Sequence, residues 1–313
     1  MSNLEYHPIT YLDIPAEKAG QRIDNFLHTY LKGVPKSHVY RILRTGQVRV
    51  NKKRIKQTYR LIAGDRLRVP PIRLQPLISP ILNTSRKQAL VNSILHEDNS
   101  LLILNKPSGM AVHGGSKINA GVIESLRVLY PNAPYLELVH RLDRDTSGCL
   151  MIAKKRSMLR RLHDLLRSGG IHKQYLALVQ GLWESHKTEV RLSLRKNVLQ
   201  SGERLVRVCS DGKLAITQFH IMKQFANASL LQVQLKTGRT HQIRVHAAHE
   251  GHPVAGDNKY GNRDFNQQMR KLALKSLFLH AEKLVINLPE IDYHLTINAP
   301  LPKNLQQVLK NLD

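Results

Sequence analysis

The chain has 313 residues, with 48 Lys and Arg against 23 Asp and Glu, a formal net charge of +25 and a pI near 10.3. Such an excess of positive charge favours a nucleic-acid partner. No apolar run is long enough to span a bilayer, and the first twenty residues lack the apolar core of a secretory signal. Two cysteines, Cys149 and Cys209, supply neither a disulfide framework nor a cysteine-rich zinc site. We therefore expect a cytoplasmic protein without a membrane partner.

A basic segment at 20–70 follows a short strand-bearing lead-in at 1–19. It holds thirteen Lys and Arg against two acidic residues. Apolar spacing predicts helices over 22–31 and 37–45, then strands near 48–50 and 66–69. Two short helices and a small sheet with cations on one side indicate an RNA-binding domain, whereas a merely solvated helix pair would mix charge signs. The candidate RNA-binding residues here are Lys36, Arg41, Arg44, Arg49, Lys52, Lys53 and Arg54.

This segment resembles the alpha-L RNA-binding motif over Gln21–Val69. The resemblance is most specific at Arg22-Ile23-Asp24, which opens the first helix, and at Val48-Arg49-Val50-Asn51 after the second. It implies that the second helix and the adjoining strand dock on structured RNA. Four prolines then punctuate a stretch without regular periodicity, which predicts a semi-extended linker over 71–87.

The remaining residues, 88–313, mix strands and helices without strict alternation. Strands are predicted at 94–95, 101–104, 173–179, 189–194, 215–221 and 230–235, with a last strand pair near 277–286. Helices are predicted at 122–129, at 157–168 with Ser157 as its N-cap, within 237–249, and at 300–312. This pattern predicts an α+β fold: a small basic domain linked to a larger domain with a mixed, largely antiparallel sheet.

The loop His140–Gly148 lies between two apolar runs that are typical of short buried strands. It contains Asp143 and Asp145 beside Arg141 and Arg144. A carboxylate near guanidinium groups stays ionised, and an ionised carboxylate in a loop can act as nucleophile, general base or metal ligand. The alternative is a turn with a solvated charge cluster.

Three further segments accompany this loop. Lys173-Gln174-Tyr175 places a tyrosine on a strand, where a half-buried structural role is the alternative. In the segment 237–246, Arg244 is suited to hold a carboxylate through two hydrogen bonds. Phe278–Glu282 has the composition of a core strand, although Leu279 can line a base pocket. Four histidines in or near the segment 237–246 raise the alternative of a zinc site: His241, His246, His249 and His252. Gly251 and Pro253 argue against that alternative, because they break the helix that would carry the ligands.

The central loop, Lys173-x-Tyr175, Gly238–Arg244 and Leu279-His280-Ala281 together resemble the large-subunit ribosomal RNA pseudouridine synthases, over nearly the whole chain. The resemblance implies isomerisation of uridine to pseudouridine without cofactor or metal. It implies that Asp143 is the catalytic carboxylate, that Tyr175 stacks on the flipped base and assists proton transfer, and that Arg244 pairs with Asp143.

The resemblance also assigns the base pocket and the RNA contacts. Leu279 would pack the base from its other side, and Arg141, Arg144 and Arg239 would contact phosphates or displace the uridine from its stack. The implied substrate is 23S ribosomal RNA, free or in an assembling particle. We expect a monomer, because the sequence shows no coiled-coil heptad and no obvious apolar interface. Two alternatives stay open: a sister synthase acting on transfer RNA, and a binding-only assembly factor in which Asp143 is dispensable.

Overall fold

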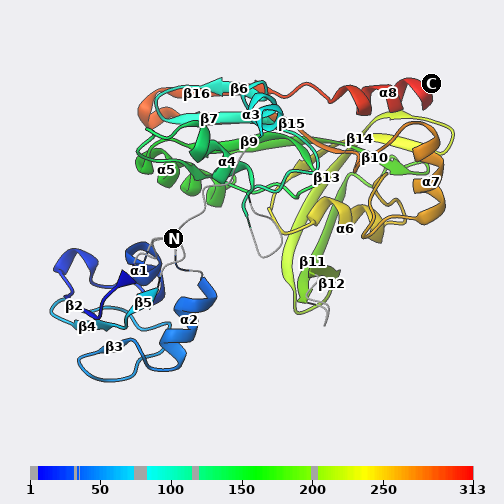
Figure 1. Cartoon of the computed structure of the whole chain (residues 1–313). Helices are drawn as coiled ribbons and strands as arrows, with labels where there is room; N and C mark the ends of the chain where they lie inside the picture. The colour runs from blue at the N-terminus through cyan, green and yellow to red at the C-terminus, as the bar shows by residue number, and fades with distance from the viewer. Residues whose placement is uncertain are drawn as a thin grey trace. The chain divides into compact units, whose positions relative to one another are not determined.

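The computed structural model describes residues 6–31, 34, 36–73, 83–114, 120–198 and 204–312. The chain divides into two compact units, Met1–Ser79 and Pro80–Asp313 (Figure 1). None of the described helices is long and apolar enough to cross a membrane.

The N-terminal unit contains the predicted pair of helices and a small sheet. Helix α1 buries Ile23 and Leu27, and α2 buries Val39 and Ile42, against Leu67 of the sheet. The helices are α1 (Ile23–Tyr30) and α2 (Lys36–Arg44), with the 3-10 turn η1 (Ala16–Lys18) before them. Strands β2 (Thr10–Asp13), β4 (Arg66–Val69) and β3 (Arg49–Val50) form one sheet, and β1 (Tyr6–His7) pairs with β5 (Ile72–Arg73).

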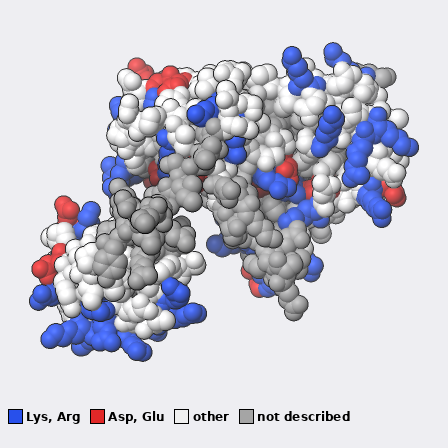
Figure 2. Space-filling model, in the orientation of Figure 1, with Lys and Arg blue, Asp and Glu red and all other residues white. Residues whose placement is uncertain are grey.

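Both acidic residues of the basic segment are used inside this unit. The carboxylate of Asp24 accepts two hydrogen bonds from the Arg22 guanidinium, at 3.1 and 2.6 Å. Asp65 is 5% exposed and accepts hydrogen bonds from Asn51 Nδ2 at 2.8 Å and the Tyr59 hydroxyl at 2.9 Å. Because Asp65 anchors Asn51, it fixes the turn that carries Lys52. The exposed surface is left strongly cationic, as Figure 2 shows along one side of this unit.

The larger unit is built on an eleven-stranded sheet within the described residues. Its order is β12-β11-β13-β14-β10-β15-β9-β7-β6, with β16 paired to β15 and β8 to β9. The strands are β6 (Ile94–Glu97), β7 (Leu101–Lys106), β8 (Glu137–Leu138), β9 (Ser147–Ala153), β10 (His172–Gln180), β11 (Glu189–Val198), β12 (Arg204–Val208), β13 (Lys213–Gln224), β14 (Ala228–Leu235), β15 (Leu279–Leu288) and β16 (Tyr293–Asn298). Every pairing between these strands is antiparallel except that of β15 with β9. The predicted α+β class with a mixed, largely antiparallel sheet is confirmed.

Six α-helices accompany this sheet in the described residues. They are α3 (Thr84–Val91), α4 (Val122–Leu129), α5 (Arg156–Ser168), α6 (Gln242–His249), α7 (Arg263–Lys271) and α8 (Lys303–Leu312), with the 3-10 turn η2 (Pro289–Ile291). The main core lies between the sheet and helices α4, α5 and α6, and includes the ring contact of Trp183 with Phe219.

Several predicted boundaries need correction. Helix α5 begins at Arg156, and Lys155 occupies the N-cap position without a capping hydrogen bond, so Ser157 is not the cap. The last strand pair is β15 with β16, which extends beyond the predicted 277–286. Helices α3 and α7 and strand β12 were not predicted. Helix α3 buries Leu90, and α7 buries Phe265 and Met269 among polar neighbours. The predicted linker 71–87 includes β5 and the first turn of α3, and 74–82 lie outside the described residues.

The sheet changes direction at the short parallel pairing of β9 with β15, where His280 faces Ser147 and Ala281 faces Gly148. Gly148 has φ +105°, and a Cβ there would lie 2.2 Å from the Ala281 carbonyl oxygen. Only glycine satisfies both the backbone conformation and the close approach of the two strands.

We therefore expect Gly148→Ala to destabilise the protein more than Gly109→Ala. Gly109 also has positive φ, at +83°, but a Cβ there would meet nothing within 4 Å. The Gly109 variant should lose about 1–3 kcal/mol through backbone strain alone, and the Gly148 variant at least about 2 kcal/mol more through overpacking. Thermal unfolding of both full-length variants measures the difference, and equal melting temperatures would contradict it.

Candidate active site

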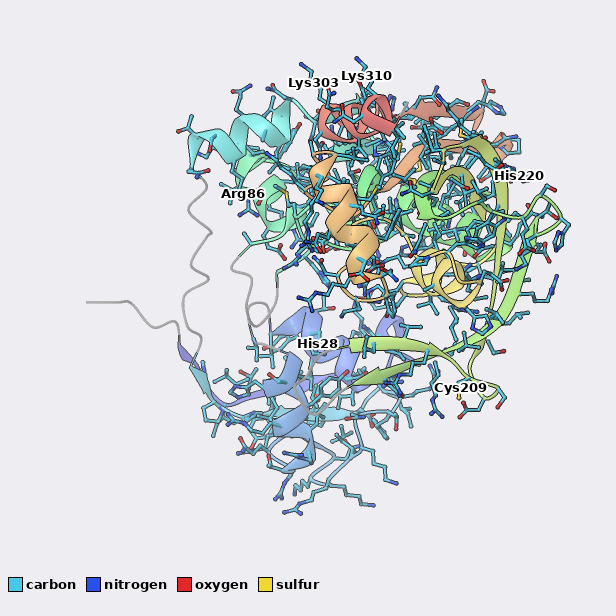
Figure 3. The ribbon with its side chains drawn as sticks, turned by 90° about the vertical axis from the view of Figure 1, so that its right-hand side faces the viewer. His28, Arg86, Cys209, His220, Lys303 and Lys310 are labelled. Carbon is cyan, nitrogen blue, oxygen red and sulfur yellow. The ribbon has the colours of Figure 1, made fainter. Side chains whose placement is uncertain are left out.

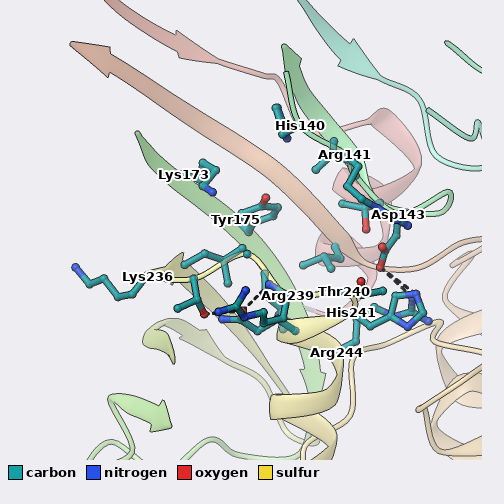
Figure 4. Close-up of a pocket in the computed structure, with 18 of the residues that line it drawn as sticks. His140, Arg141, Asp143, Lys173, Tyr175, Lys236, Arg239, Thr240, His241 and Arg244 are labelled. Carbon is teal, nitrogen blue, oxygen red and sulfur yellow. Dashed lines mark hydrogen bonds and ion pairs between the residues drawn. The ribbon is translucent and has the colours of Figure 1, made fainter. Parts of the chain in front are cut away.

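A cavity of about 540 Å³ lies where the loop before β9, the start of β10, the end of β14 and the start of α6 meet. It gathers most of the predicted site residues, as Figure 4 shows. The predicted residues among its lining are Arg141, Asp143, Tyr175, Arg239, Arg244 and Leu279. Arg144 is not among them: its side chain is 64% exposed and pairs with Asp145 at 3.2 Å.

The predicted ion pair between Arg244 and Asp143 is present, with Nη1 donating to Oδ2 at 3.1 Å. The two-bond fork of the guanidinium, however, holds Asp257 rather than Asp143. Arg244 Nε donates to Asp257 Oδ2 at 2.7 Å, and Nη2 donates to Oδ1 at 2.8 Å. The Tyr260 ring lies 5.1 Å from the guanidinium carbon, where a cation–π contact is favourable. Arg244 is thus fixed by Asp257 and offers one remaining donor to Asp143.

The charges of this group stabilise each other in a largely buried position. Burial opposes the charge of Arg244, but the hydrogen bonds and charge of Asp257, together with Asp143, raise the pKa of Arg244 above its ordinary value. Burial likewise opposes ionisation of Asp257, yet the Arg244 guanidinium and the backbone N–H groups of Lys259 and Tyr260 lower the pKa of Asp257. The Arg244 guanidinium therefore lies between two carboxylates and pairs with both.

Asp257 was not predicted from the sequence. It lies on the loop after α6, outside any periodic pattern, and its side chain is 1% exposed. The sequence offers one weak signal for Asp257. Acidic residues are few after the Gly238 motif, and Asp257 is one of three in the next 27 residues, with Glu250 and Asp264.

The loop that carries Asp143 is held by two side chains from one segment, the end of β7 and the residues directly after it. Lys106 is fully buried, and its Nζ donates to the carbonyl oxygens of Pro107, Met110 and Arg144 at 2.8–2.9 Å. The Ser108 hydroxyl donates to the Asp145 carbonyl oxygen at 2.7 Å. Burial lowers the pKa of Lys106 to about 7, against the opposing attraction of Asp145 and Asp143. These contacts attach the loop to the end of β7, and they too were not predicted.

Tyr175 and Leu279 stand on neighbouring strands in the cavity wall, since Ala177 of β10 pairs with Leu279 of β15. Both side chains are buried, at 6% and 4% exposure. Burial, and then the charge of Asp143, raise the pKa of Tyr175 above its ordinary value, so its hydroxyl stays protonated. Burial lowers the pKa of Lys173, which lines the same wall.

Two histidines of the cavity are neutral at physiological pH. Burial, helped by the nearby charge of Lys173, lowers the pKa of His140 to about 3, and its Nε2 accepts a hydrogen bond from the Met151 N–H at 3.2 Å. Burial lowers the pKa of His241 to about 4, although its Nε2 lies 3.7 Å from Asp143 Oδ2. His241 adopts a left-handed backbone conformation directly before α6, which directs its ring into the cavity (Figure 4).

The histidines of the zinc alternative lie in separate surroundings. His241 Nδ1 hydrogen-bonds the Tyr260 hydroxyl at 2.7 Å, whereas His252 Nδ1 hydrogen-bonds the Gln180 carbonyl oxygen at 2.8 Å. His246 is fully buried in α6, and His249 is exposed. Across the part of the chain that the structure describes, no three or more His, Cys, Asp or Glu side chains are arranged to hold a metal ion.

Comparison with known proteins shows the family. Residues 100–249 match the RNA pseudouridylate synthase model, and residues 21–67 match the S4 domain model. The chain belongs to the RNA pseudouridylate synthase family, and its N-terminal unit contains an S4 domain.

Two curated relatives match nearly the whole chain, and both are named ribosomal large subunit pseudouridine synthase C. The relative from Salmonella typhimurium is 55% identical over 307 residues, 95% of this chain and 96% of its own length. The relative from Escherichia coli strain K12 is 54% identical over 305 residues, 96% of this chain and 95% of its own. Among solved structures, human RNA pseudouridylate synthase domain containing 4 is 26% identical with a TM-score of 0.59, covering 72% of this chain and 95% of that one.

We expect Asp257→Asn to destabilise the protein by about 3–5 kcal/mol at pH 7, because it leaves the buried Arg244 guanidinium without its main counter-charge. The folded-state pKa of Asp257 lies below its ordinary value of 3.8. The stabilisation is therefore present above about pH 4 and is lost as the pH falls through the folded-state value. Melting temperatures of wild type and variant from pH 7 to pH 3 should converge toward acid.

Asp264→Asn is the matched control, since Asp264 lies exposed in the first turn of α7. It should change the melting temperature little. A loss as large as that of Asp257→Asn would contradict the assignment of Asp257 to the buried ion pair.

Proposed function

We propose that this chain isomerises specific uridines to pseudouridine in large-subunit ribosomal RNA, with Asp143 as its catalytic carboxylate. The observation that carries the proposal is the Asp143–Arg244 pair opening onto a cavity walled by Tyr175 and Leu279. The names of the relatives support large-subunit RNA as substrate. Neither of these two relatives is named for transfer RNA, the alternative substrate.

The reaction breaks the glycosidic bond between C1′ and N1 and joins C1′ to C5, which then loses its hydrogen. Uracil must detach, rotate and reattach without leaving the protein, so a closed pocket is needed. A catalytic group must also stay anionic in that pocket. Arg244 supplies this condition for Asp143, whose side chain is only 17% exposed.

Asp143 presents one carboxylate oxygen to the substrate. Its Oδ2 accepts the hydrogen bond from Arg244, while no hydrogen bond to Oδ1 occurs in the described residues. Oδ1 is therefore the oxygen that attacks the sugar or the uracil ring, or removes a proton from the sugar. Each of these roles needs the ionised carboxylate.

The flipped base lies between Tyr175 and Leu279 in this proposal. The Tyr175 ring stacks on uracil, its protonated hydroxyl assists proton transfer, and Leu279 packs on the other side. Arg141 and Arg239 contact flanking phosphates or displace the uridine from its stack, and the more exposed Arg144 contacts the backbone outside the cavity. Flipping costs a few kcal/mol and is easiest in unpaired RNA.

The S4-containing unit supplies affinity for structured RNA through its exposed cations. Arg41, Arg44, Arg49, Lys52, Lys53 and Arg54 are exposed; the side chain of Lys36 lies outside the described residues. We assign 20–70 to the RNA-binding domain and 88–313 to the catalytic domain. The protein acts as a cytoplasmic monomer, on 23S RNA or its assembling particle.

Asp143→Asn should abolish pseudouridine formation, with a loss of at least about 10³-fold in rate, because the amide neither attacks nor accepts a proton. RNA binding should change less than threefold. Tritium release from 5-tritiated uridine in a large-subunit transcript measures the reaction, with a transfer RNA transcript as comparison.

Asp145→Asn is the control for this substitution, since Asp145 is the neighbouring carboxylate and its side chain is 43% exposed. It should keep most of the activity. If Asp143→Asn releases tritium as the wild type does, the catalytic assignment is wrong. Release only from the transfer RNA transcript would favour the sister-synthase alternative.

Charge reversal at the S4 domain separates binding from catalysis. Arg41→Glu with Arg44→Glu should weaken binding of the transcript at least tenfold, because phosphate contacts become repulsive. Lys303→Glu with Lys310→Glu on α8 is the matched control; Figure 3 shows both lysines at the surface of that helix. An equal loss in both variants would show that only total charge matters.

A further inference from the structure

Helix α5 carries a row of arginines whose position the reaction does not explain. Residues 154–173 contain seven Lys and Arg against one acidic residue, Asp164. At about 100° per residue, Arg156, Arg160 and Arg167 fall within about 40° of one another around the helix axis. All three side chains are exposed, and Met158 and Leu162 are buried on the opposite side. The row therefore runs along the outer face of α5 for about 16 Å.

The row ends at the catalytic cavity. Leu166 and Arg167 are among the residues that line it, beside Arg141 and Lys173. The other end of the row, at Arg156, lies at the start of α5, and the helix packs against β9 along the outside of the unit (Figure 1). The arginines thus extend from the rim of the cavity outward over the surface of the catalytic unit.

Helix stability does not account for the cations at the start of α5. The N-terminus of a helix favours acidic residues and a Ser, Thr, Asp or Asn cap. Here Lys155 occupies the N-cap position without a capping hydrogen bond, Arg156 follows it, and the first turn has no acidic residue. Arg167, by contrast, lies in the last turn, where a cation is favourable. The positive charge at Arg156 therefore lowers the stability of the helix slightly.

Ion pairing does not account for these cations either. Within the described residues, neither Arg156 nor Arg160 makes an ion pair, whereas Arg167 pairs with Asp164. Two exposed guanidinium groups remain available to phosphate oxygens, which they can bind through two parallel hydrogen bonds.

The row is held in place relative to the catalytic loop. His163, which lies beside the arginine row on the same side of α5, hydrogen-bonds the Val139 carbonyl oxygen through Nε2 at 3.0 Å. Val139 directly precedes the loop His140–Gly148 and lies four residues before Asp143. RNA bound along α5 would therefore be positioned directly with respect to Asp143.

We propose that the outer face of α5, through Arg156 and Arg160, binds the phosphate backbone of the RNA strand that leads from the flipped uridine at the cavity. The inference rests on the proposed function, because it takes RNA as the substrate. It assigns to α5 an RNA contact separate from those of the S4 domain. This contact begins at Arg167, at the rim of the pocket, and continues along the helix.

The test compares Arg156→Gln/Arg160→Gln with Arg263→Gln/Arg270→Gln. Arg263 and Arg270 are exposed on α7 of the same unit, so both variants lose two arginines from a helix surface. The α5 variant should raise KM for the large-subunit transcript about tenfold and leave kcat within twofold. It should also make the slope of log Kd against log salt less steep by about 1.4, the value for two contacts to a single strand. The α7 variant should change neither quantity.

Three outcomes would overturn the proposal: equal effects in the two variants, an unchanged KM in the α5 variant, or a loss confined to kcat. Arg156→Lys/Arg160→Lys keeps both charges and should retain most of the salt slope, and equal melting temperatures exclude unfolding. The binding measurements are repeated in an Asp143→Ala background. If neither the wild type nor any variant forms pseudouridine, the proposed function fails. The affinity of the Asp143→Ala proteins for the transcript, with and without the α5 substitutions, then tests the α5 surface by itself.

Discussion

The proposed reaction depends on an ionised Asp143, whose side chain is only 17% exposed in the cavity wall. A simple buried pair of Asp143 with Arg244 would be neutral, and a two-bond fork would occupy both carboxylate oxygens. The structure avoids this by giving the fork to Asp257, which leaves Arg244 a single donor for Asp143. The guanidinium is thereby oriented before any substrate arrives, which is the condition for electrostatic preorganisation.

This arrangement requires two segments far apart in sequence to meet accurately. Asp143 lies on the loop before β9, whereas Arg244 and Asp257 belong to α6 and the loop after it. The loop is attached by Lys106, whose Nζ donates to the Arg144 carbonyl oxygen of the loop and to the carbonyl oxygens of Pro107 and Met110 in its own segment. The parallel contact of β9 with β15, close enough to need Gly148, brings Leu279 to the same cavity. The geometry of the site is therefore set by backbone contacts at the centre of the sheet.

The parts of the fold that the sequence predicts are those whose apolar residues form an unbroken run or recur at a regular spacing. Strand β9 is wholly buried, and α5 buries a regular stripe, so both were found. Helix α7 buries only Phe265, Asn266 and Met269 among polar neighbours, and it was missed. The same distinction holds in the site. Asp143 and Tyr175 were predicted by resemblance and line the cavity, whereas Lys106 and Asp257 make tertiary contacts that no local pattern encodes.

A net charge of +25 can favour RNA binding only if the cations stay exposed and are not neutralised by acidic neighbours. In the basic N-terminal segment the two acidic residues are used to fix Arg22 and the turn at Asn51, so they do not neutralise the surface. In α5 the cations at the N-terminus oppose the helix dipole. Near Asp143, His140 and His241 add no positive charge at physiological pH, because burial lowers the pKa of both rings. In the proposed function, the exposed cations give an affinity for RNA that weakens steeply with salt, and the pocket selects the single flipped nucleotide.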